Sequence, residues 1–202
     1  PNATIVTPSG VTLKAGDPVV TYVARNLEPY RGFHVFMRAL EKLQRQHKTV
    51  HALIVGDGPL GGEIRRRAER WGVSDSLTMA GAIDHEQMPD VIASFDIALA
   101  PYPVLPHDFY FSPLKLFEYL ACAVPVVASD SGQIGDILGD GVHALLAPAG
   151  DLAALADRCV LLPDDPVVAR RIGEAGARLV RERFTWEHNA ATVVGLAAGA
   201  AR

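Results

Sequence analysis

Cysteines and long apolar runs are scarce in this 202-residue sequence. The two cysteines, Cys122 and Cys159, lie far apart and form no CxxC pair, so neither a disulfide framework nor a cysteine-based metal site is indicated. Both stand among apolar residues, which predicts small core residues in a reducing, cytoplasmic setting. No stretch approaches the roughly 20 apolar residues that a membrane-spanning helix needs, and no signal peptide opens the sequence.

Positive charge is not in excess either. Lys and Arg total 19 against 23 Asp and Glu, for a formal net charge of -4, so no basic field would recruit nucleic acid. Four arginines cluster on one predicted helix: Arg65, Arg66, Arg67 and Arg70. We interpret them as a solvated helix face rather than as a polyanion site. The sequence begins at Pro1 without a methionine, and whether it is a fragment or a natural subunit stays open.

What the sequence does contain is an alternation of apolar, β-branched runs with amphipathic segments. A hydrophobic content of 49% fits one globular domain with its own core. Buried strands are predicted at residues 19–24, 51–55, 77–79, 97–100, 124–128 and 143–146. Inward helix faces are predicted for Phe33, Phe36, Leu40 and Leu43, and for Leu152, Leu155 and Cys159 of a helix that Asp151 caps. The alternation predicts an α/β fold, a Rossmann-like doubly wound parallel sheet with helices on both faces.

Residues 109–129, FYFSPLKLFEYLACAVPVVAS, combine a loop, a helix and a buried strand. Ser112 can cap the backbone N–H groups of the first helical turn. Pro113 fits the first helical position, where its missing N–H costs nothing. Apolar residues at a spacing of three to four predict a buried stripe formed by Leu114, Phe117, Leu120 and Ala121.

Lys115 and Glu118 fall outside this stripe and close to each other. A solvated ion pair is the simpler interpretation, and it stays open as an alternative. The N-terminus of a helix, however, presents N–H groups and a positive dipole end that suit a phosphate. The Glu118 carboxylate could then hold hydroxyl groups of the molecule that carries the phosphate.

The block SPLKLFEYLACAVPVVAS resembles the donor-binding signature of the retaining, family 4 type glycosyltransferases of GT-B fold, the glycosyl transferases group 1. In that family a helix glutamate binds the ribose of a nucleotide-sugar, and another glutamate eight residues earlier commonly contacts the transferred sugar. The matching residues here are Glu118 and Tyr110. At the sugar contact this chain departs from the family, so Tyr110, Asp108 or His107 replaces the carboxylate, or the sugar is held differently.

The resemblance extends to two arginines at the predicted carboxyl edge of the sheet, where open α/β sheets bind ligands. Arg25 follows the first strand and Arg31 precedes a glycine, and both match basic residues that touch the donor diphosphate in the family. A pair of surface arginines is the alternative. Ala82 and Ile83 match backbone positions beside the nucleotide base, and Gly58 matches a loop close to the donor.

Two other motifs point to structure rather than to a site. The GDGP turn at residues 56–59 continues to Gly61 and so has the GxGxxG spacing, but a lone glycine-rich turn is weak evidence, because glycine is also the default for any tight strand-to-helix turn. It therefore predicts no dinucleotide site. His85 and Glu86 lack the further ligands that a metal site needs, and a helix start is the preferred interpretation.

Over residues 5–200 the resemblance implies the carboxyl-terminal, donor-binding domain of a cytoplasmic, retaining, metal-independent glycosyltransferase of glycan biosynthesis. No cofactor is expected, since the donor is a nucleotide-diphosphate sugar. Arg25 and Arg31 would be the catalytic residues that stabilise the leaving phosphate, together with the backbone amides around Ser112, Leu114 and Lys115. The acceptor, a glycan, a lipid or a small molecule, would bind a missing amino-terminal domain.

The expected domain organisation follows from this resemblance. Residues 1–18 are a linker and lead-in segment, residues 19–183 the nucleotide-sugar-binding domain, and residues 184–202 a helix that crosses toward the missing domain. Phe184 and Trp186 resemble the closing motif of the family, although Trp186 alone would indicate a core or interface residue. Without the missing domain, the chain is expected to bind the donor weakly and to transfer little.

Three questions stay open at this point. Peripheral membrane association of the full-length protein is one. A non-catalytic nucleotide-binding or partner subunit is a second interpretation of the chain, which the tyrosine at position 110 favours. A dinucleotide-dependent oxidoreductase of similar architecture is a third, for which a lone glycine-rich turn is weak evidence.

Overall fold

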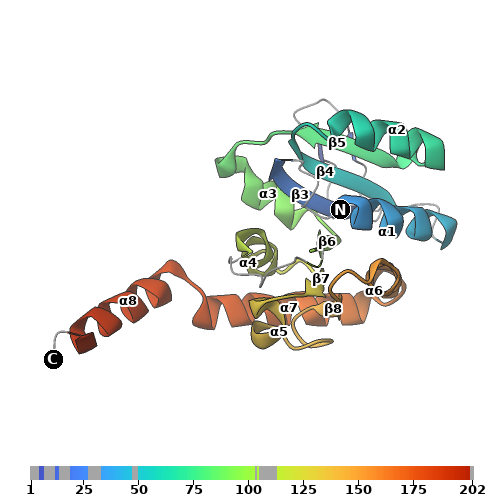
Figure 1. Cartoon of the computed structure of the whole chain (residues 1–202). Helices are drawn as coiled ribbons and strands as arrows, with labels where there is room; N and C mark the ends of the chain where they lie inside the picture. The colour runs from blue at the N-terminus through green and yellow to red at the C-terminus, as the bar shows by residue number, and fades with distance from the viewer. Residues whose placement is uncertain are drawn as a thin grey trace.

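A six-stranded sheet, parallel in every pairing, forms the centre of the computed structural model (Figure 1). The structure describes residues 5–6, 12–13, 19–26, 33–46, 50–102, 104 and 113–200. The strands, in the order β5-β4-β3-β6-β7-β8, are β3 (Val19–Asn26), β4 (His51–Asp57), β5 (Leu77–Gly81), β6 (Ile97–Ala100), β7 (Val126–Asp130) and β8 (Leu145–Pro148). A separate antiparallel pair is formed by β1 (Ile5–Val6) and β2 (Thr12–Leu13).

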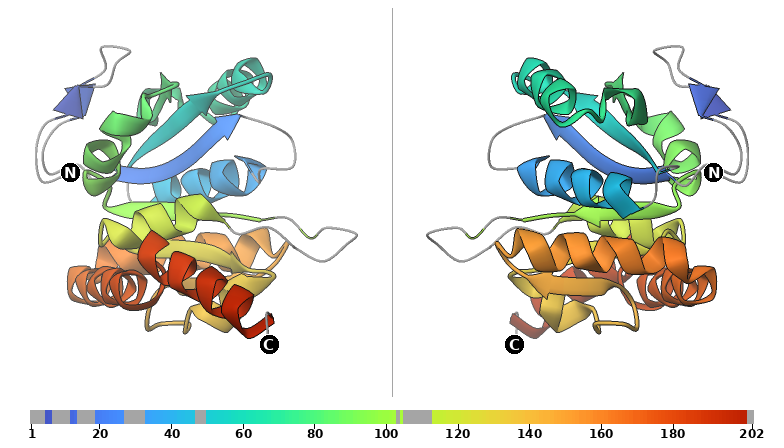
Figure 2. Two further views of the ribbon diagram at one scale, coloured as in Figure 1. Left: turned by 90° about the vertical axis from the view of Figure 1, so that its left-hand side faces the viewer. Right: turned by 90° about the vertical axis from the view of Figure 1, so that its right-hand side faces the viewer.

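Helices cover both sides of the sheet (Figure 2). They are α1 (Phe33–Gln46), α2 (Gly61–Trp71), α3 (Met88–Ala93), α4 (Leu114–Ala121), α5 (Gln133–Ile137), α6 (Leu152–Asp164), α7 (Pro166–Arg183) and α8 (Trp186–Ala200), with the 3-10 turns η2 (Ser74–Ser76) and η3 (His85–Gln87). Asp151 caps α6 as predicted, since its Oδ1 accepts from the Ala154 N–H at 2.9 Å. Asp165 caps α7 in the same way. The predicted doubly wound α/β fold is therefore confirmed.

Two hydrophobic cores explain why the strands are mostly apolar. Along β4, Ala52 and Ile54 face one core, which α1, α2 and α6 close. Leu53 and Val55 face the other core, which α3, α4 and α5 close. Because successive side chains of a strand point to opposite faces, a sheet covered on both faces needs mainly apolar residues along each strand.

The helix α4 is rotated relative to the predicted stripe. Leu120 is buried as predicted, but Leu114 is 60% exposed and Ala121 is exposed, whereas Leu116 and Tyr119 are fully buried. The prediction failed because almost every position of LKLFEYLA is apolar, so the spacing alone did not identify the buried face. Pro113 lies just before the helix, as its N-cap residue, rather than at the first helical position.

Other predicted boundaries and burials also need correction. The strands β7 and β8 each begin two residues later than predicted. For β7 the cause is the end of α4, where the Val124 N–H donates to the Tyr119 carbonyl at 3.1 Å and so belongs to the helix-ending turn. Leu152 is 37% exposed, although Leu155 and Cys159 of the same helix are buried. Trp186 is 77% exposed and so is no core residue, and Cys122 is only partly buried.

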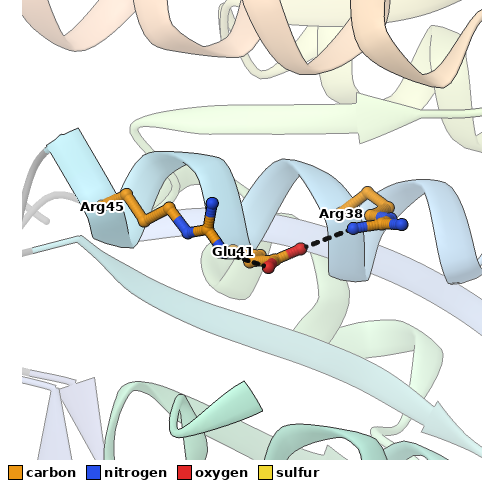
Figure 3. A network of polar contacts seen from close by, with 3 residues as sticks. All are labelled: Arg38, Glu41 and Arg45. Carbon is orange, nitrogen blue, oxygen red and sulfur yellow. Dashed lines mark hydrogen bonds and ion pairs between the residues drawn. The ribbon is translucent and has the colours of Figure 1, made fainter.

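The solvent side of α1 carries a network of three charged residues (Figure 3). The Glu41 carboxylate accepts from Arg38 at 2.9 Å and from Arg45 at 2.8 Å. Lys42 pairs with Asp157 of α6, so cations and carboxylates neutralise each other along this layer. On α2 the side chains of Arg65, Arg66 and Arg70 are exposed, as expected for a solvated helix face.

Candidate functional site

The strand order places a topological switch point between β3 and β6. From β3 the chain builds the sheet outward through β4 and β5, and from β6 it builds in the opposite direction through β7 and β8. In open α/β sheets, ligands bind beside the carboxyl ends of the strands at such a point. Arg25, Gly58 and the pair Ala82 and Ile83 lie at or just beyond the carboxyl ends of β3, β4 and β5. Four of the predicted site positions therefore share one edge of the sheet.

Some predicted site residues fall outside the residues that the structure describes. These are Arg31, Tyr110 and Ser112, together with the alternative sugar contacts His107 and Asp108. For Arg25 the structure describes the backbone. Its role and those of the residues just named stay predictions.

The carboxyl ends of three neighbouring strands are irregular. Between Val23 and Asn26 the register of β3 shifts against β4, so Arg25 lies in a bulge. The register of β4 shifts against β5 as well, where Val55 and Gly56 both face Gly81. Bulges of this kind concentrate next to active sites, where they redirect side chains and end the pairing. The register shifts and the switch point in the strand order therefore indicate the same edge of the sheet.

Gly58 begins the tight turn from β4 to α2. Its backbone N–H donates to the Asp57 carboxylate at 2.7 Å, and its φ of 155° is a conformation that only glycine adopts readily. A turn without a Cβ lets another molecule approach the backbone closely. Beyond β5, Ala82 is exposed and Ile83 is partly buried against the second core, and the following η3 carries His85 and Glu86 exposed.

The first turn of α4 follows β6 along the chain and is electropositive. The first N–H groups of a helix have no acceptor within it, and the helix dipole adds partial positive charge there. Lys115 lies in this turn, which contains no acidic residue. Its Nζ lies 5.2 Å from the centroid of the Tyr102 ring, a cation–π distance. A phosphate group would be favoured at this end of the helix.

Tyr102 and Ser129 are residues of this region that sequence reasoning missed. Tyr102 is 4% exposed and Ser129 is 2% exposed, and the Tyr102 N–H donates to the Ser129 Oγ at 2.9 Å. The ladder between β6 and β7 ends at the pair Ala100 and Ala128, because Pro101 has no N–H to continue it. A proline directly after a buried strand, and a lone serine ending the apolar run VVAS, were the available signals.

Glu118 lies on α4 three residues after Lys115, and its side chain is exposed. The spacing puts both residues on neighbouring parts of the helix surface. Its charge acts on Cys122 one turn further on: burial, then the Glu118 carboxylate and then Asp90, raise the pKa of the Cys122 thiol. The aromatic rings of Phe117 and Phe184, with centroids 5.3 Å apart, connect the middle of α4 to the end of α7.

The described ranges contain neither a cluster of metal ligands nor a membrane-spanning helix. Within them, no three His, Cys, Asp or Glu side chains come together as ligands of a metal would. None of the helices described there has both the length and the apolar character to cross a bilayer.

Known proteins resemble this chain over most of its length. It is 34% identical over 167 residues to a phosphatidyl-myo-inositol mannosyltransferase of Mycobacterium leprae, covering 83% of this chain and 42% of the relative. The sucrose-phosphate synthase of Thermosynechococcus elongatus superimposes with a TM-score of 0.80 at 27% identity, over 93% of this chain and 46% of that one. The structure of Anabaena HepE in complex with UDP-glucose superimposes with a TM-score of 0.78 at 23% identity, over 91% of this chain and 50% of that one.

These proteins are all considerably longer than this 202-residue chain. The chain spans less than half the length of the curated relative and about half of each solved structure. The solved structures have the GT-B architecture, of which this chain forms one Rossmann-like half. The family model "Glycosyl transferases group 1" matches residues 17–165, which include the sheet edge with its bulges and the whole of α4. The chain therefore belongs to the glycosyl transferases group 1 family.

Proposed function

We propose that this chain is the donor-binding domain of a retaining glycosyltransferase, which transfers a sugar from a nucleotide-diphosphate sugar to an acceptor. The observation that carries the proposal is the position of the predicted residues. Arg25, Gly58, Ala82 and Ile83 share the carboxyl edge at the switch point. Family membership supports the transferase interpretation over the dinucleotide-dependent oxidoreductase.

The chemistry to be catalysed is departure of a nucleoside diphosphate from the anomeric carbon of a sugar. Negative charge grows on the leaving phosphate, so cations placed there stabilise the transition state more than the ground state. We assign this role to Arg25 and Arg31 as catalytic residues, with support from Lys115 and the amides of Ser112 and Leu114. Protein cations then supply the stabilisation, and the proposal includes neither a metal ion nor a cofactor.

The remaining donor contacts follow the same edge. Glu118 would hold the ribose hydroxyls, since its exposed side chain lies just over one turn from the N-terminus of α4, where the diphosphate is proposed to bind. The backbone at Ala82 and Ile83 would contact the base, and the turn at Gly58 would lie beside the donor. Tyr110 is assigned to the transferred sugar.

The acceptor site belongs to a further domain in this proposal. Figure 1 shows α8 extending away from the sheet, and its exposed apolar side chains include Trp186, Val193, Val194 and Leu196. A helix with so much exposed apolar surface is expected to be covered by another surface. We propose an amino-terminal domain there, with a glycan, lipid or small-molecule acceptor, so that this chain alone transfers little or nothing.

We place the full-length enzyme in the cytoplasm, where nucleotide-sugars are available and where its free cysteines would stay reduced. The relative from Mycobacterium leprae is named as a phosphatidyl-myo-inositol mannosyltransferase. A lipid-linked acceptor at the membrane surface is therefore among those to test. Vesicle co-sedimentation of the full-length protein would measure its peripheral membrane association.

A calorimetric screen with UDP, GDP, ADP and their sugars tests the donor site. The full-length protein should bind one nucleotide saturably, Glu118→Ala should weaken that binding, and Glu174→Ala, which removes an exposed carboxylate from α7, should not. Absence of binding by every nucleotide would overturn the proposal. Binding without any sugar transfer or donor hydrolysis would favour the non-catalytic subunit instead.

A further inference from the structure

The tripeptide Gly-Asp-Gly occurs twice in the chain, at residues 56–58 and 139–141. In an Asp-Gly pair the glycine nitrogen can attack the side-chain carboxyl carbon of the aspartate, because glycine has no Cβ to hinder the approach. The N–Cγ bond forms, the hydroxyl group of the protonated acid leaves as water with the amide proton, and a cyclic imide results. Water then opens the ring at either carbonyl. Opening at the backbone carbonyl gives isoaspartate, whose main chain runs through Cβ and Cγ.

The two copies of the tripeptide match in sequence and in exposure. Asp57 and Asp140 are both exposed, and Gly58 and Gly141 are both half-buried. Both of these glycines also have a positive φ, which is 155° at Gly58 and 70° at Gly141. The hydrogen bonds around the two Asp-Gly pairs are what differ, so they decide which pair can react.

In the second copy both reacting groups are held by other partners. Asp140 Oδ1 accepts from the Leu146 N–H and Asp140 Oδ2 accepts from Arg158, each at 2.9 Å. The Gly141 N–H donates to the Ala144 carbonyl at 2.8 Å, and Asp140 and Ala144 form a β-bridge. The nitrogen and the carboxyl carbon can therefore meet only after these hydrogen bonds have broken. The fold protects this Asp-Gly pair.

In the first copy the two reacting groups lie against each other. The Gly58 N–H donates to Asp57 Oδ1 at 2.7 Å, and the carboxylate has no further hydrogen-bond partner in the described part of the chain. The nitrogen is therefore already beside the group that it has to attack, and rotation of the side chain brings the carboxyl carbon to it. Reactants held next to each other lose little further entropy when they react. Nothing competes for the carboxylate, as Leu146 and Arg158 do at Asp140.

We propose that Asp57 is a site of spontaneous isoaspartate formation, and that the fold protects Asp140 from the same reaction. The product has one additional methylene group in the main chain at the carboxyl end of β4, directly before Gly58. This turn lies at the edge of the sheet where the nucleotide-sugar is proposed to bind. The modification therefore lowers nucleotide affinity as the protein ages. Its effect on affinity rests on the proposed function, whereas the modification itself does not.

Peptide mapping of the aged full-length protein tests the site. The protein is incubated at mildly acidic pH and physiological temperature, and isoaspartate is identified by mass spectrometry and by resistance to an aspartate-specific protease. We expect isoaspartate at position 57 to accumulate about tenfold faster than at position 140. In protein kept unfolded in urea, the two positions should react at similar rates. Equal rates in the folded protein, or a native difference that persists unchanged in urea, would overturn the proposal.

Two substitutions change one copy each. Asp57→Glu keeps the carboxylate but requires a larger, less favourable ring, so modification at this position should stop. Arg158→Ala removes one of the hydrogen bonds that hold Asp140, so isoaspartate at position 140 should form about two- to tenfold faster. Thermal unfolding of Arg158→Ala is the control for folding. An unchanged rate at position 140 would overturn the protective role of its hydrogen bonds.

Affinity measurements separate this proposal from the proposed function. Nucleotide binding is measured by calorimetry before and after ageing, for the unmodified protein and for Asp57→Glu, each relative to its own fresh sample. The unmodified protein should lose affinity in proportion to its isoaspartate at position 57, and Asp57→Glu should keep its affinity. Isoaspartate at position 57 in a protein that binds no nucleotide would refute the proposed function and support the site. Nucleotide binding without isoaspartate at position 57 would refute the site alone.

Discussion

The helices α1 and α4 lie on opposite faces of the sheet and hold their cations differently. On α1 the carboxylate of Glu41 bonds to Arg38 and Arg45, and Lys42 pairs with Asp157 (Figure 3). On α4 the Lys115 ammonium group lies over an aromatic ring, in a first turn without an acidic residue. Charges neutralised by carboxylates add little stability and attract no anion. In the proposed function, only the α4 side of this comparison binds an anion.

The two faces also differ in how a helix ends. Both α2 and α4 close with the same pair of backbone bonds, in which the last N–H groups fold back onto the preceding turn. On α2 the left-handed position is Gly72, with φ of 67°, whereas on α4 it is Ala123, with φ of 57°. The end of α4 is therefore the more strained of the two. It also packs against α7 at Gly173.

The largest expected effect concerns the arginines. In the full-length enzyme, Arg25→Ala or Arg31→Ala should lower kcat/KM, because each removes a cation from the leaving phosphate. The loss should correspond to about 2–4 kcal/mol of transition-state stabilisation. Arg45→Ala, on the solvent side of α1, should leave kcat/KM unchanged. Steady-state kinetics of the three variants would measure the difference. Wild-type turnover by both Arg25→Ala and Arg31→Ala would remove the proposed distinction between the two regions.

Two glycine substitutions should change stability in opposite directions. A Cβ on Gly173 would lie 2.1 Å from the Ala123 carbonyl oxygen, a backbone atom, so Gly173→Ala should destabilise the chain by about 1–3 kcal/mol. Gly62 lies on the exposed face of α2, with Arg66 as its nearest neighbour at 3.4 Å. Gly62→Ala should stabilise the chain by about 0.5–1 kcal/mol through helix propensity. Urea unfolding of both variants measures the free energy of unfolding, and equal signs would contradict the expectation.

Relief of strain at the end of α4 should give a smaller gain. Ala123→Gly should raise the free energy of unfolding by about 1 kcal/mol, because glycine adopts a positive φ without the Cβ penalty. On α2 the reverse substitution, Gly72→Ala, should lower it by a similar amount. Thermal and urea unfolding would compare the two variants. A loss of stability in Ala123→Gly would show that the alanine methyl group contributes packing that outweighs the strain.

The smallest effect is a change in thiol reactivity. The Glu118 carboxylate helps to raise the pKa of Cys122, so Glu118→Gln should lower that pKa and increase the thiolate fraction at a given pH. Alkylation by iodoacetamide between pH 7.5 and about pH 9 should then be faster in Glu118→Gln and unchanged in Glu174→Gln. Cys159 is a built-in control, because it is buried and its pKa is raised by that burial, so it should stay unmodified in the folded protein. An unchanged alkylation rate at Cys122 would show that the Glu118 carboxylate lies too far from the thiol to change its pKa.

Local patterns in the sequence determined the order of strands and helices, the caps at Asp151 and Asp165, and the block SPLKLFEYLA by which the family is identified. Each depends on residues close together in the chain, where propensity, capping and glycine conformation act. The strand-to-helix alternation predicted the doubly wound sheet for the same reason. The position of Arg25, Gly58, Ala82 and Ile83 at one edge follows from that fold.

The tertiary structure decided what depends on neighbours from distant parts of the chain. It determined which side of α4 is buried, so that Leu114 is exposed and Leu116 and Tyr119 are not. It also determined that Val124 ends a helix instead of beginning a strand. The contact of Lys115 with Tyr102, and the bond of Tyr102 to Ser129, join segments that no periodicity relates. Such contacts depend on how helices pack against the sheet, which local residue patterns do not encode.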